Sequence, residues 1–253
     1  MPAEETSPAV VLRARDYAES DRIVTLLTRD YGKLGGIAKG AKASRHRFER
    51  KLEPFSHVMV HFSRRPHGQL VFITRAEAAD LLQFRIEDEL GRIALGTYML
   101  ELTDTLTVES GDATDAYQTL VSALGVLSEH SAQTAIRQAF ELRALRWAGF
   151  GLEFAQCRVC ANQADTEAVY FVVGRGGVVC ARCRSGVPEA AIRLRMESAA
   201  ALARLGAMAL EEVSGATSAG ADGALAIARF LNSIVDRKLR TADFLDSILS
   251  GGT

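Results

Sequence analysis

The sequence predicts an α+β multidomain protein, in which a small β-barrel is followed by an all-helical domain that carries an inserted cysteine-rich segment. Two observations lead to this fold class. The hydrophobic pattern is short and β-like up to about residue 80 and helical beyond it. All four cysteines lie within residues 157–183, as two identical C-x2-C pairs between predicted helices.

The barrel is predicted from five runs of β-branched residues between residues 9 and 79, separated by Asp, Gly and Pro signals. In "HVMVHF" the alternation places Val58, Val60 and Phe62 on one face of a strand. Five short strands in about 75 residues are typical of a closed or nearly closed barrel of the OB type. We therefore expect residues 1–80 to form a five-stranded OB-type barrel.

Helices are predicted after residue 80, where the period of the apolar residues changes. Residues 84–108 and 115–129 contain no proline, and a third helix is expected to begin near Ser131 and to end at Gly149. Helical character returns directly after Pro188 and again from Asp222, across a Gly/Ala/Ser-rich connector. The helical domain is therefore expected in two parts, residues 81–155 and 188–253, with the cysteine segment 156–187 inserted between them.

The overall composition is that of an ordinary soluble globular protein, with 48% hydrophobic and 24% charged residues. No apolar run is long enough to span a bilayer, and the N-terminal "MPAEETSPAV" is acidic where a signal peptide would be basic. We therefore expect a cytoplasmic protein without a membrane partner. The net charge of −1 hides an asymmetry, because residues 1–80 carry a net charge of +4 and residues 81–253 a net charge of −5.

The cysteines have the spacing of a metal site: C-x2-C, nineteen residues, and C-x2-C. Each C-x2-C turn directs two sulfurs at one point, and two such turns joined by a hairpin place four thiolates at about 2.3 Å from a zinc ion. The segments "AVYFVV" and "GGVV" are the expected hairpin strands of this zinc ribbon. We expect one structural Zn²⁺ per chain, bound by Cys157, Cys160, Cys180 and Cys183.

Other uses of the cysteines fit less well. Two disulfides would need an oxidising compartment, and nothing in the sequence indicates export. A redox C-x2-C motif would be expected once, at the start of a helix in a βαβ unit, and no such unit is found. An iron–sulfur cluster stays open as an alternative to zinc.

A basic run extends from the third predicted strand into the segment that follows it. Between residues 33 and 51 it holds seven Lys and Arg residues against a single acid, Glu49. A local excess of this kind indicates a polyanion partner, and barrels of this type bind single strands with a charged groove and stacking aromatic rings. The predicted DNA-binding residues are Lys33, Lys39, Lys42, Arg45, Arg47, Arg50 and Lys51.

We expect this run to form a strand end and a flexible loop, with Phe48 and Tyr31 as candidate stacking faces. The alternative is an ordinary solvated loop, which charge runs commonly are. A phosphate-binding P-loop is rejected, because Gly40 is followed by Ala41 where that motif requires lysine.

No Ser-His-Asp, Cys-His or paired-carboxylate arrangement emerges from the sequence, so we expect a protein that is not an enzyme. His57 and His61 have the spacing of a helical metal pair, but their segment alternates as a strand does. Asp16, Glu19 and Asp21 cluster in a predicted turn, where a solvated hairpin is the simpler interpretation.

Several short motifs follow one another along the chain. They are "Y-x-E-x-D-x-I-V" at residues 17–24, "T-x-x-Y-G" at residues 28–32, "AKGA" at residues 38–41, "LEPFSHVMV" from Leu52 and "FLNSIVDRKLRTADFL" at residues 230–245. In these motifs the chain closely resembles the bacterial recombination mediators of the RecO family, nearly from end to end. One departure is Thr241, where the family pattern has Ser-Arg, and this leaves the C-terminal helix junction open.

The resemblance implies an OB barrel, a helical domain and, in many members, a zinc module inserted in the helical part. It also implies a DNA repair protein that binds single- and double-stranded DNA and anneals complementary strands. With its partner RecR such a protein helps to load RecA onto strands covered by single-strand-binding protein, whose acidic C-terminal tail binds the helical domain. The expected location is the cytoplasm, on the nucleoid.

Two other classes of function fit the sequence less well. A zinc-ribbon transcription or RNA-binding factor is the alternative, in which the ribbon would make the specific contact. A nuclease or ligase fits worse, because no carboxylate cluster for Mg²⁺ and no nucleotide-binding lysine context is found.

Overall fold

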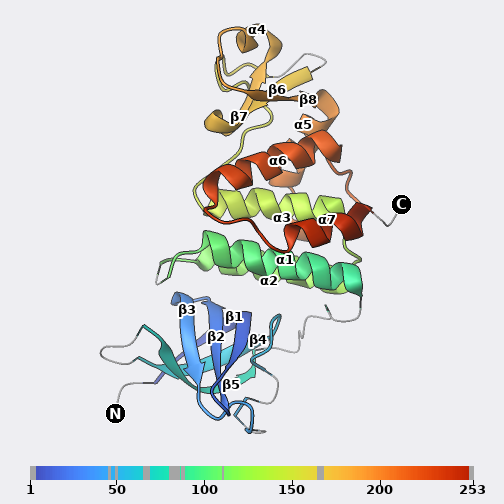
Figure 1. Ribbon diagram of the computed structural model, residues 1–253. Coiled ribbons are helices and arrows are strands. Elements are labelled where there is room, and N and C mark those ends of the chain that lie inside the picture. Colours follow the sequence, from blue (N-terminus) through green and yellow to red (C-terminus); the bar gives the residue numbers. More distant parts are fainter. Residues whose placement is uncertain are drawn as a thin grey trace. The chain divides into compact units, whose positions relative to one another are not determined.

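The computed structural model describes residues 4–44, 47–48, 51–64, 69–79, 86, 89–109, 111–163 and 168–250. Its contacts divide the chain into two compact units, Met1–Ser131 and Ala132–Thr253. The first unit contains a closed β-barrel and two helices, and the second contains further helices and a three-stranded sheet (Figure 1). The predicted α+β architecture with an N-terminal barrel is therefore confirmed.

The barrel has the five predicted strands in the predicted order along the chain. They are β1 (Glu4–Tyr17), β2 (Asp21–Thr28), β3 (Gly32–Ala38), β4 (His57–Ser63) and β5 (Val71–Ala78). They close in the order β1-β2-β3-β5-β4, with β3 and β5 parallel and the other neighbours antiparallel. Strand β1 joins the two ends of the sheet, because its first half pairs with β4 and its second half with β2. A bulge between Val11 and Arg13 bends β1 near the change of partner.

The barrel interior is filled by alternate residues of each strand. Val58, Val60 and Phe62 of β4 are buried, as the alternation predicts. Gly36 of β3 leaves room for β5, because a Cβ atom there would lie 2.5 Å from Cδ1 of Ile73. Buried side chains from the segment between β3 and β4, Phe48 and Leu52, complete the core.

Helices α1 (Leu90–Leu106) and α2 (Thr114–Glu129) pack against the outer side of the barrel, on β1 and β2. This packing explains why Val10, Leu12 and Leu27 are almost inaccessible to solvent. Gly32, in the turn from β2 to β3, has φ of +67°, and a Cβ atom there would lie 2.0 Å from the carbonyl oxygen of Gly111. The turn therefore approaches the loop between α1 and α2 backbone to backbone, which requires glycine.

The second unit combines helices with a small sheet. Its helices are α3 (Thr134–Trp147), α5 (Met196–Ala207), α6 (Gly220–Ile234) and α7 (Ala242–Ser250), with a 3₁₀ turn at Leu210–Glu212. The sheet has the order β7-β6-β8 and consists of β6 (Ala168–Val172), β7 (Gly177–Cys180) and β8 (Ala191–Arg195). A 3₁₀ turn at Val173–Arg175 joins β6 to β7, and the short helix α4 (Ala181–Arg184) follows β7. Among the described residues, no helix combines the length and the apolar character needed to cross a membrane.

Aromatic rings connect the sheet to the helices of the second unit. Phe171 of β6 stacks on Phe154 with ring centres 5.4 Å apart, and its ring centre lies 6.4 Å from that of Phe230 on α6. Asp222 of α6 accepts hydrogen bonds from the Arg195 backbone N–H at 2.9 Å and from the Ser198 hydroxyl at 2.7 Å. These contacts join the end of β8 and the start of α5 to α6.

One expectation about this unit is wrong. The sequence reads as helical directly after Pro188, but Ala191–Arg195 form strand β8, and α5 begins only at Met196. Leu194 is buried between the exposed Arg193 and Arg195, and the strand pairs with β6 along its whole length. Because this partner strand is distant in the sequence, the local period of apolar residues did not reveal it.

Candidate metal centre and nucleic-acid interface

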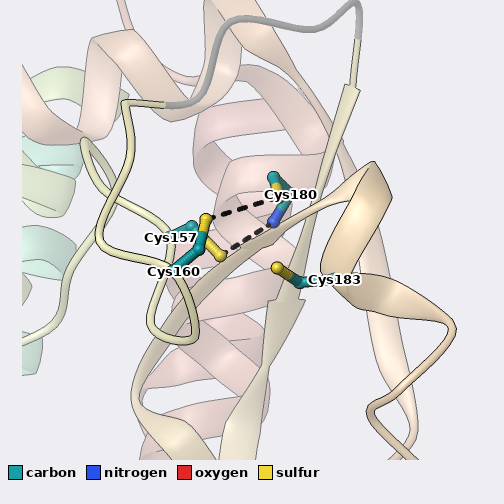
Figure 2. A group of neighbouring side chains, drawn as sticks. All are labelled: Cys157, Cys160, Cys180 and Cys183. Atoms are coloured by element: carbon teal, nitrogen blue, oxygen red, sulfur yellow. Dashed lines mark hydrogen bonds between the residues drawn. The ribbon is translucent and has the colours of Figure 1, made fainter.

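The four predicted cysteine ligands converge on one point beside the small sheet (Figure 2). Their sulfur atoms all lie within 4.8 Å of one another. Cys157 and Cys160 lie in the loop before β6, Cys180 ends β7, and Cys183 lies in the short helix α4. Two C-x2-C turns therefore bring four thiols together, as their spacing predicts.

The distances fit a tetrahedral metal site. Four thiolates at about 2.3 Å from a zinc ion are about 3.8 Å from one another. The Sγ atoms of Cys160 and Cys180 lie 3.9 Å apart, close to that value. All four ligand positions come from the protein, so an ion bound here would have no open position for water or substrate.

The thiols differ in their affinity for protons. Burial alone would raise the pKa of the Cys157 thiol, but hydrogen bonds from the backbone N–H groups of Cys160, Cys180 and Val159 lower that pKa to about 6. Hydrogen bonds with Cys180 and with the other thiols of the cluster, together with burial, raise the pKa of Cys183 to about 12. At neutral pH Cys157 is therefore a thiolate, whereas Cys183 carries a proton that a metal ion must displace.

A small apolar cluster holds the cysteine turns in place. Val172 of β6, Val179 of β7 and Val187 are buried among the cysteines. Four thiolates suit a soft or borderline metal such as zinc or iron. In the described part of the chain these cysteines are the one group of three or more potential ligands within reach of a single ion. The donor set and its geometry fit a structural metal.

Lys33, the first residue of the predicted DNA-binding set, lies on β3 and interacts with helix α1. Its Nζ donates to the carbonyl oxygen of Asp104 at 2.7 Å and lies 3.4 Å from Asp104 Oδ1. Only 12% of the Lys33 side chain is exposed. Asp104 is also paired with Arg13 at 2.8 Å. Lys33 thus links the barrel to α1, and we exclude it from the candidate interface.

The segment after β3 is anchored in the barrel, where the sequence predicts a flexible loop. Phe48 is only 2% exposed and packs in the barrel core, so the expectation that it stacks on a base is wrong. Tyr31 is half-buried, with its ring edge-on to Phe62 at 5.3 Å between ring centres. The guanidinium of Arg47 lies 5.1 Å from the centre of the Phe48 ring, and its Nη2 donates to the carbonyl oxygen of Lys39 at 3.1 Å.

Contacts with the turn between β1 and β2 fix the position of residues 39–44. The backbone N–H of Lys42 donates to the carbonyl oxygen of Ser20 at 3.0 Å. The backbone N–H of Gly40 donates to Asp21 Oδ1 at 2.8 Å. Lys42 Nζ lies 3.0 Å from Asp16 Oδ2, and hydrogen bonds from Lys42 and Arg22 lower the pKa of Asp16. The acidic turn is thus a hairpin in which the carboxylates of Asp16 and Asp21 bind groups of the chain itself.

The other predicted cations differ in exposure. Lys39, Lys42 and Arg47 are exposed, and Lys51 is half-buried. Arg45 and Arg50 lie outside the described residues. Three cations of the predicted set are therefore displayed on the segment that packs against the β1–β2 turn.

Two exposed residues of β1, which are not among the predicted site residues, flank Asp16 in the sequence and point to the opposite face of the strand. Arg15 and Tyr17 are exposed at the end of β1, with 51% of Tyr17 accessible to solvent. Asp16, which lies between them, pairs with Lys42, so this end of β1 is adjacent to the cationic segment. Strand alternation in "ARDY" places both side chains on one face, and this was the available signal.

The histidines of β4 have separate surroundings. His57 Nε2 and the Tyr117 hydroxyl of α2 lie 2.7 Å apart, within hydrogen-bond distance. His61 Nε2 lies 3.8 Å from Glu77 Oε2. Both occupy the outer side of the barrel, as the alternation predicts.

Comparison with known proteins gives matches along the whole chain. The family model described as Recombination protein O N terminal matches residues 1–82, and the one described as Recombination protein O C terminal matches residues 87–243. A DNA repair protein RecO of Anaeromyxobacter sp. (strain Fw109-5) is 38% identical over 244 residues, which cover 94% of each chain. The proteins of the same name from Streptomyces coelicolor and Syntrophotalea carbinolica are 33% and 32% identical, over 94% and 97% of this chain and 96% and 95% of theirs.

Proposed function

The chain belongs to the recombination protein O family of DNA repair proteins, and from this membership we propose that it binds single- and double-stranded DNA and anneals complementary strands. With RecR, it helps to load RecA onto strands covered by single-strand-binding protein. In this role it acts by binding and not by covalent chemistry. Its place is the cytoplasm, on the nucleoid.

The observation that carries the DNA-binding proposal is the exposed cationic segment on the barrel. Lys39, Lys42 and Arg47 are exposed on the segment that packs against the β1–β2 turn. Arg15 and Tyr17 are exposed at the end of β1, on either side in sequence of Asp16, the partner of Lys42. Cations that follow a strand backbone, together with a ring for stacking, are the features that barrels of this type use for single strands. Arg45, Arg50 and Lys51 belong to the proposed surface through the family resemblance.

Annealing follows from the same electrostatics. Two complementary strands repel one another through their phosphates, and bound cations reduce this repulsion by replacing condensed counterions. A protein that holds both strands close together then allows base pairs to form without a chemical step. Neither a nucleotide nor a magnesium ion is needed for this mechanism.

We assign the four-cysteine site to one zinc ion per chain. The sulfur separations fit a tetrahedron of thiolates, and no ligand position is left open for catalysis. When bound, the ion cross-links the loop before β6 to β7 and α4. Its role in this proposal is to fold the ribbon.

We also propose that the acidic tail of single-strand-binding protein binds the helical part of the chain, residues 81–253. A pocket of about 180 Å³ in the second unit supports this assignment. Its lining includes the apolar Leu142, Phe154 and Leu202 and the basic Arg146. The lining also includes Glu153, whose Oε1 accepts hydrogen bonds from two backbone N–H groups. Such a lining suits an apolar C-terminal residue, with its main-chain carboxylate beside Arg146.

A salt titration of single-strand binding tests the barrel surface. Each engaged phosphate contributes a slope of about −0.7 in log affinity against log salt. Replacing Lys39, Lys42 and Arg47 together by Ala should therefore reduce the slope by about 2 and weaken binding similarly for all sequences. Annealing without ATP or Mg²⁺ should decrease in parallel.

The matched control carries the same change of charge on the second unit. In it Arg204, Arg229 and Lys238, which are all exposed, are replaced by Ala. The control should keep the slope of the unmodified protein. Equal slopes for the barrel variant and the unmodified protein would show that the barrel surface does not contact DNA.

A further inference from the structure

Arg184 and Arg193 lie near Tyr170 on the metal-binding sheet, and the exposed Arg182 belongs to the same short helix as Arg184. Tyr170 lies on β6, the central strand, and is half-buried, whereas its neighbours Val169 and Phe171 are buried on the opposite face. The guanidinium of Arg184 lies 5.8 Å from the centre of the Tyr170 ring. Arg193 of β8 is directly opposite Tyr170 in the strand pairing, so both side chains lie on the same face of the sheet.

These guanidinium groups are not neutralised by carboxylates of the described chain. Arg182 and Arg193 are exposed, and no ion pair joins either of them, or Arg184, to an acid within the described ranges. Two of the described acids near the sheet already have partners. Glu153 accepts hydrogen bonds from two backbone N–H groups, at 2.7 and 3.1 Å, and Glu189 pairs with Arg175 at 3.0 Å.

The charge of the metal site does not account for the orientation of these arginines. A divalent ion with four thiolates carries a net charge of −2, which nearby cations would offset. In the described structure, however, the N–H donors to the sulfur of Cys157 are backbone groups, those of Val159 and Cys180. Arg184 instead donates to the carbonyl oxygen of Val187 and lies over the Tyr170 ring. Its guanidinium is thus held in place by the Val187 carbonyl and the Tyr170 ring.

A guanidinium held in place loses little conformational entropy when it binds an anion, and its planar donors match a phosphate. We propose that Arg182, Arg184 and Arg193 form a second phosphate-binding surface, which takes the backbone of a nucleic-acid strand. This inference rests on the proposed function, because annealing requires two strands on one protein. The barrel and the ribbon, one on each unit, then supply a surface for each strand.

The test uses the full-length, zinc-loaded protein with Arg182→Glu and Arg193→Glu combined. Arg184 is left unchanged because it packs in the ribbon. Binding of a first labelled strand should stay within about twofold of the unmodified protein, since the barrel surface is intact. Capture of a second, complementary strand, followed by energy transfer between two dyes, should slow by about tenfold, the effect of losing one charge-assisted contact.

Two controls separate the possible causes of a change. Arg204→Glu with Arg229→Glu alters the net charge equally and should leave annealing unchanged. Zinc content, measured on each variant, shows whether the ribbon is folded. If the charge reversals release zinc, the milder variant with Arg182→Ala and Arg193→Ala is used in their place. It should slow annealing by about threefold, which is half of the tenfold effect on a logarithmic scale.

Each outcome assigns a different cause. If the ribbon variant anneals like its control while the barrel variant loses DNA binding, the second surface is wrong and the proposed function stands. If the unmodified protein binds no DNA, the proposed function itself fails. If the ribbon variant loses binding of an acidic peptide but anneals normally, the surface takes a protein partner, and the proposal is overturned.

Discussion

Lys33 and Lys39 lie six residues apart in one basic run, yet their side chains have different surroundings. Lys33 is paired with Asp104 and is nearly buried, whereas Lys39 is exposed. Removing a partner from a buried carboxylate leaves an uncompensated charge, which is much more costly than the loss of an exposed cation. The two lysines therefore provide a test of which cations belong to the fold and which to the DNA surface.

We expect Lys33→Ala to lower the free energy of unfolding by about 1–3 kcal/mol, because Asp104 keeps Arg13 as a partner. The slope of DNA affinity against salt should not change. Lys39→Ala should do the opposite, with stability within about 0.5 kcal/mol of the unmodified protein and the slope reduced by about 0.7. Denaturant unfolding and salt titration of both variants provide the measurements. A reduced slope in Lys33→Ala would place that lysine in the interface after all.

At this scale the sequence indicates which segment is basic, but not which of its side chains point into the barrel core and which point to solvent. The run of residues 33–51 was recognised as basic, and the strand alternation of β4 was correct for every residue. Phe48, which lies between cations in the sequence, fills the barrel core. Which side of a barrel wall a loop residue enters depends on contacts with distant strands, and composition does not specify those contacts.

At the scale of elements, we expect the folding of the ribbon to depend on a bound metal ion. Binding of a structural zinc ion contributes on the order of 10 kcal/mol to the folding of such a segment. We expect Cys160→Ser to lose the ion and to loosen residues 157–183, which hydrogen exchange would detect. Binding of a first DNA strand by the barrel should largely survive. Iron and sulfide in the purified protein, or no metal at all, would contradict the assignment to zinc.

The affinity for zinc should fall at low pH, because protons compete with the metal ion for the thiolates. The pKa of Cys183 is raised to about 12, so its proton must be displaced at every pH in the usual working range. The pKa of Cys157 is lowered to about 6, so this thiol competes for a proton only below that pH. Zinc affinity should therefore fall as pH falls, and more steeply below pH 6. Competition with a chelating dye between pH 5.5 and 8.5 measures this, and an affinity that rises with acidity would exclude thiolate ligands.

Elements with a strong local period were predictable, and those defined by a distant partner were not. The barrel strands and helices α1, α2 and α3 follow from alternation and helical spacing. The C-x2-C spacing predicted the convergence of four sulfurs, since each pair is fixed locally by its own turn. Strand β8 was not predicted, because its five residues directly precede a helix and share its apolar character. These residues form a strand because they pair with β6.

At the scale of the whole molecule, the surfaces that we propose are divided between the unit that ends at Ser131 and the unit that follows it. The barrel surface lies in the first unit. The pocket proposed for the acidic tail of single-strand-binding protein lies in the second, with residues of α3, α5 and the segment before the metal site. The two ligands are therefore expected to bind one protein molecule at the same time.

We expect Arg146→Glu in the full-length protein to weaken binding of an acidic tail peptide by about tenfold or more, because it places a like charge beside the carboxylate of the peptide. Binding of single strands should not change. Arg229→Glu, an exposed site on α6, is the matched control. Fluorescence anisotropy with a labelled peptide measures both. If the barrel variant lost the peptide while Arg146→Glu kept it, the tail would bind the first unit.

The double pairing of β1 has a consequence for the synthesis of the protein. As the chain leaves the ribosome, the second half of β1 meets β2 at once, but the first half waits for β4, since Glu4 pairs with Ser63. Until then it is an unpaired edge, which other nascent chains can extend. Ring closure by distant segments is also intrinsically slow. The yield of folded protein in a cell therefore depends on how promptly residues 57–78 follow the first strand, and on the chaperones that shield it during the delay.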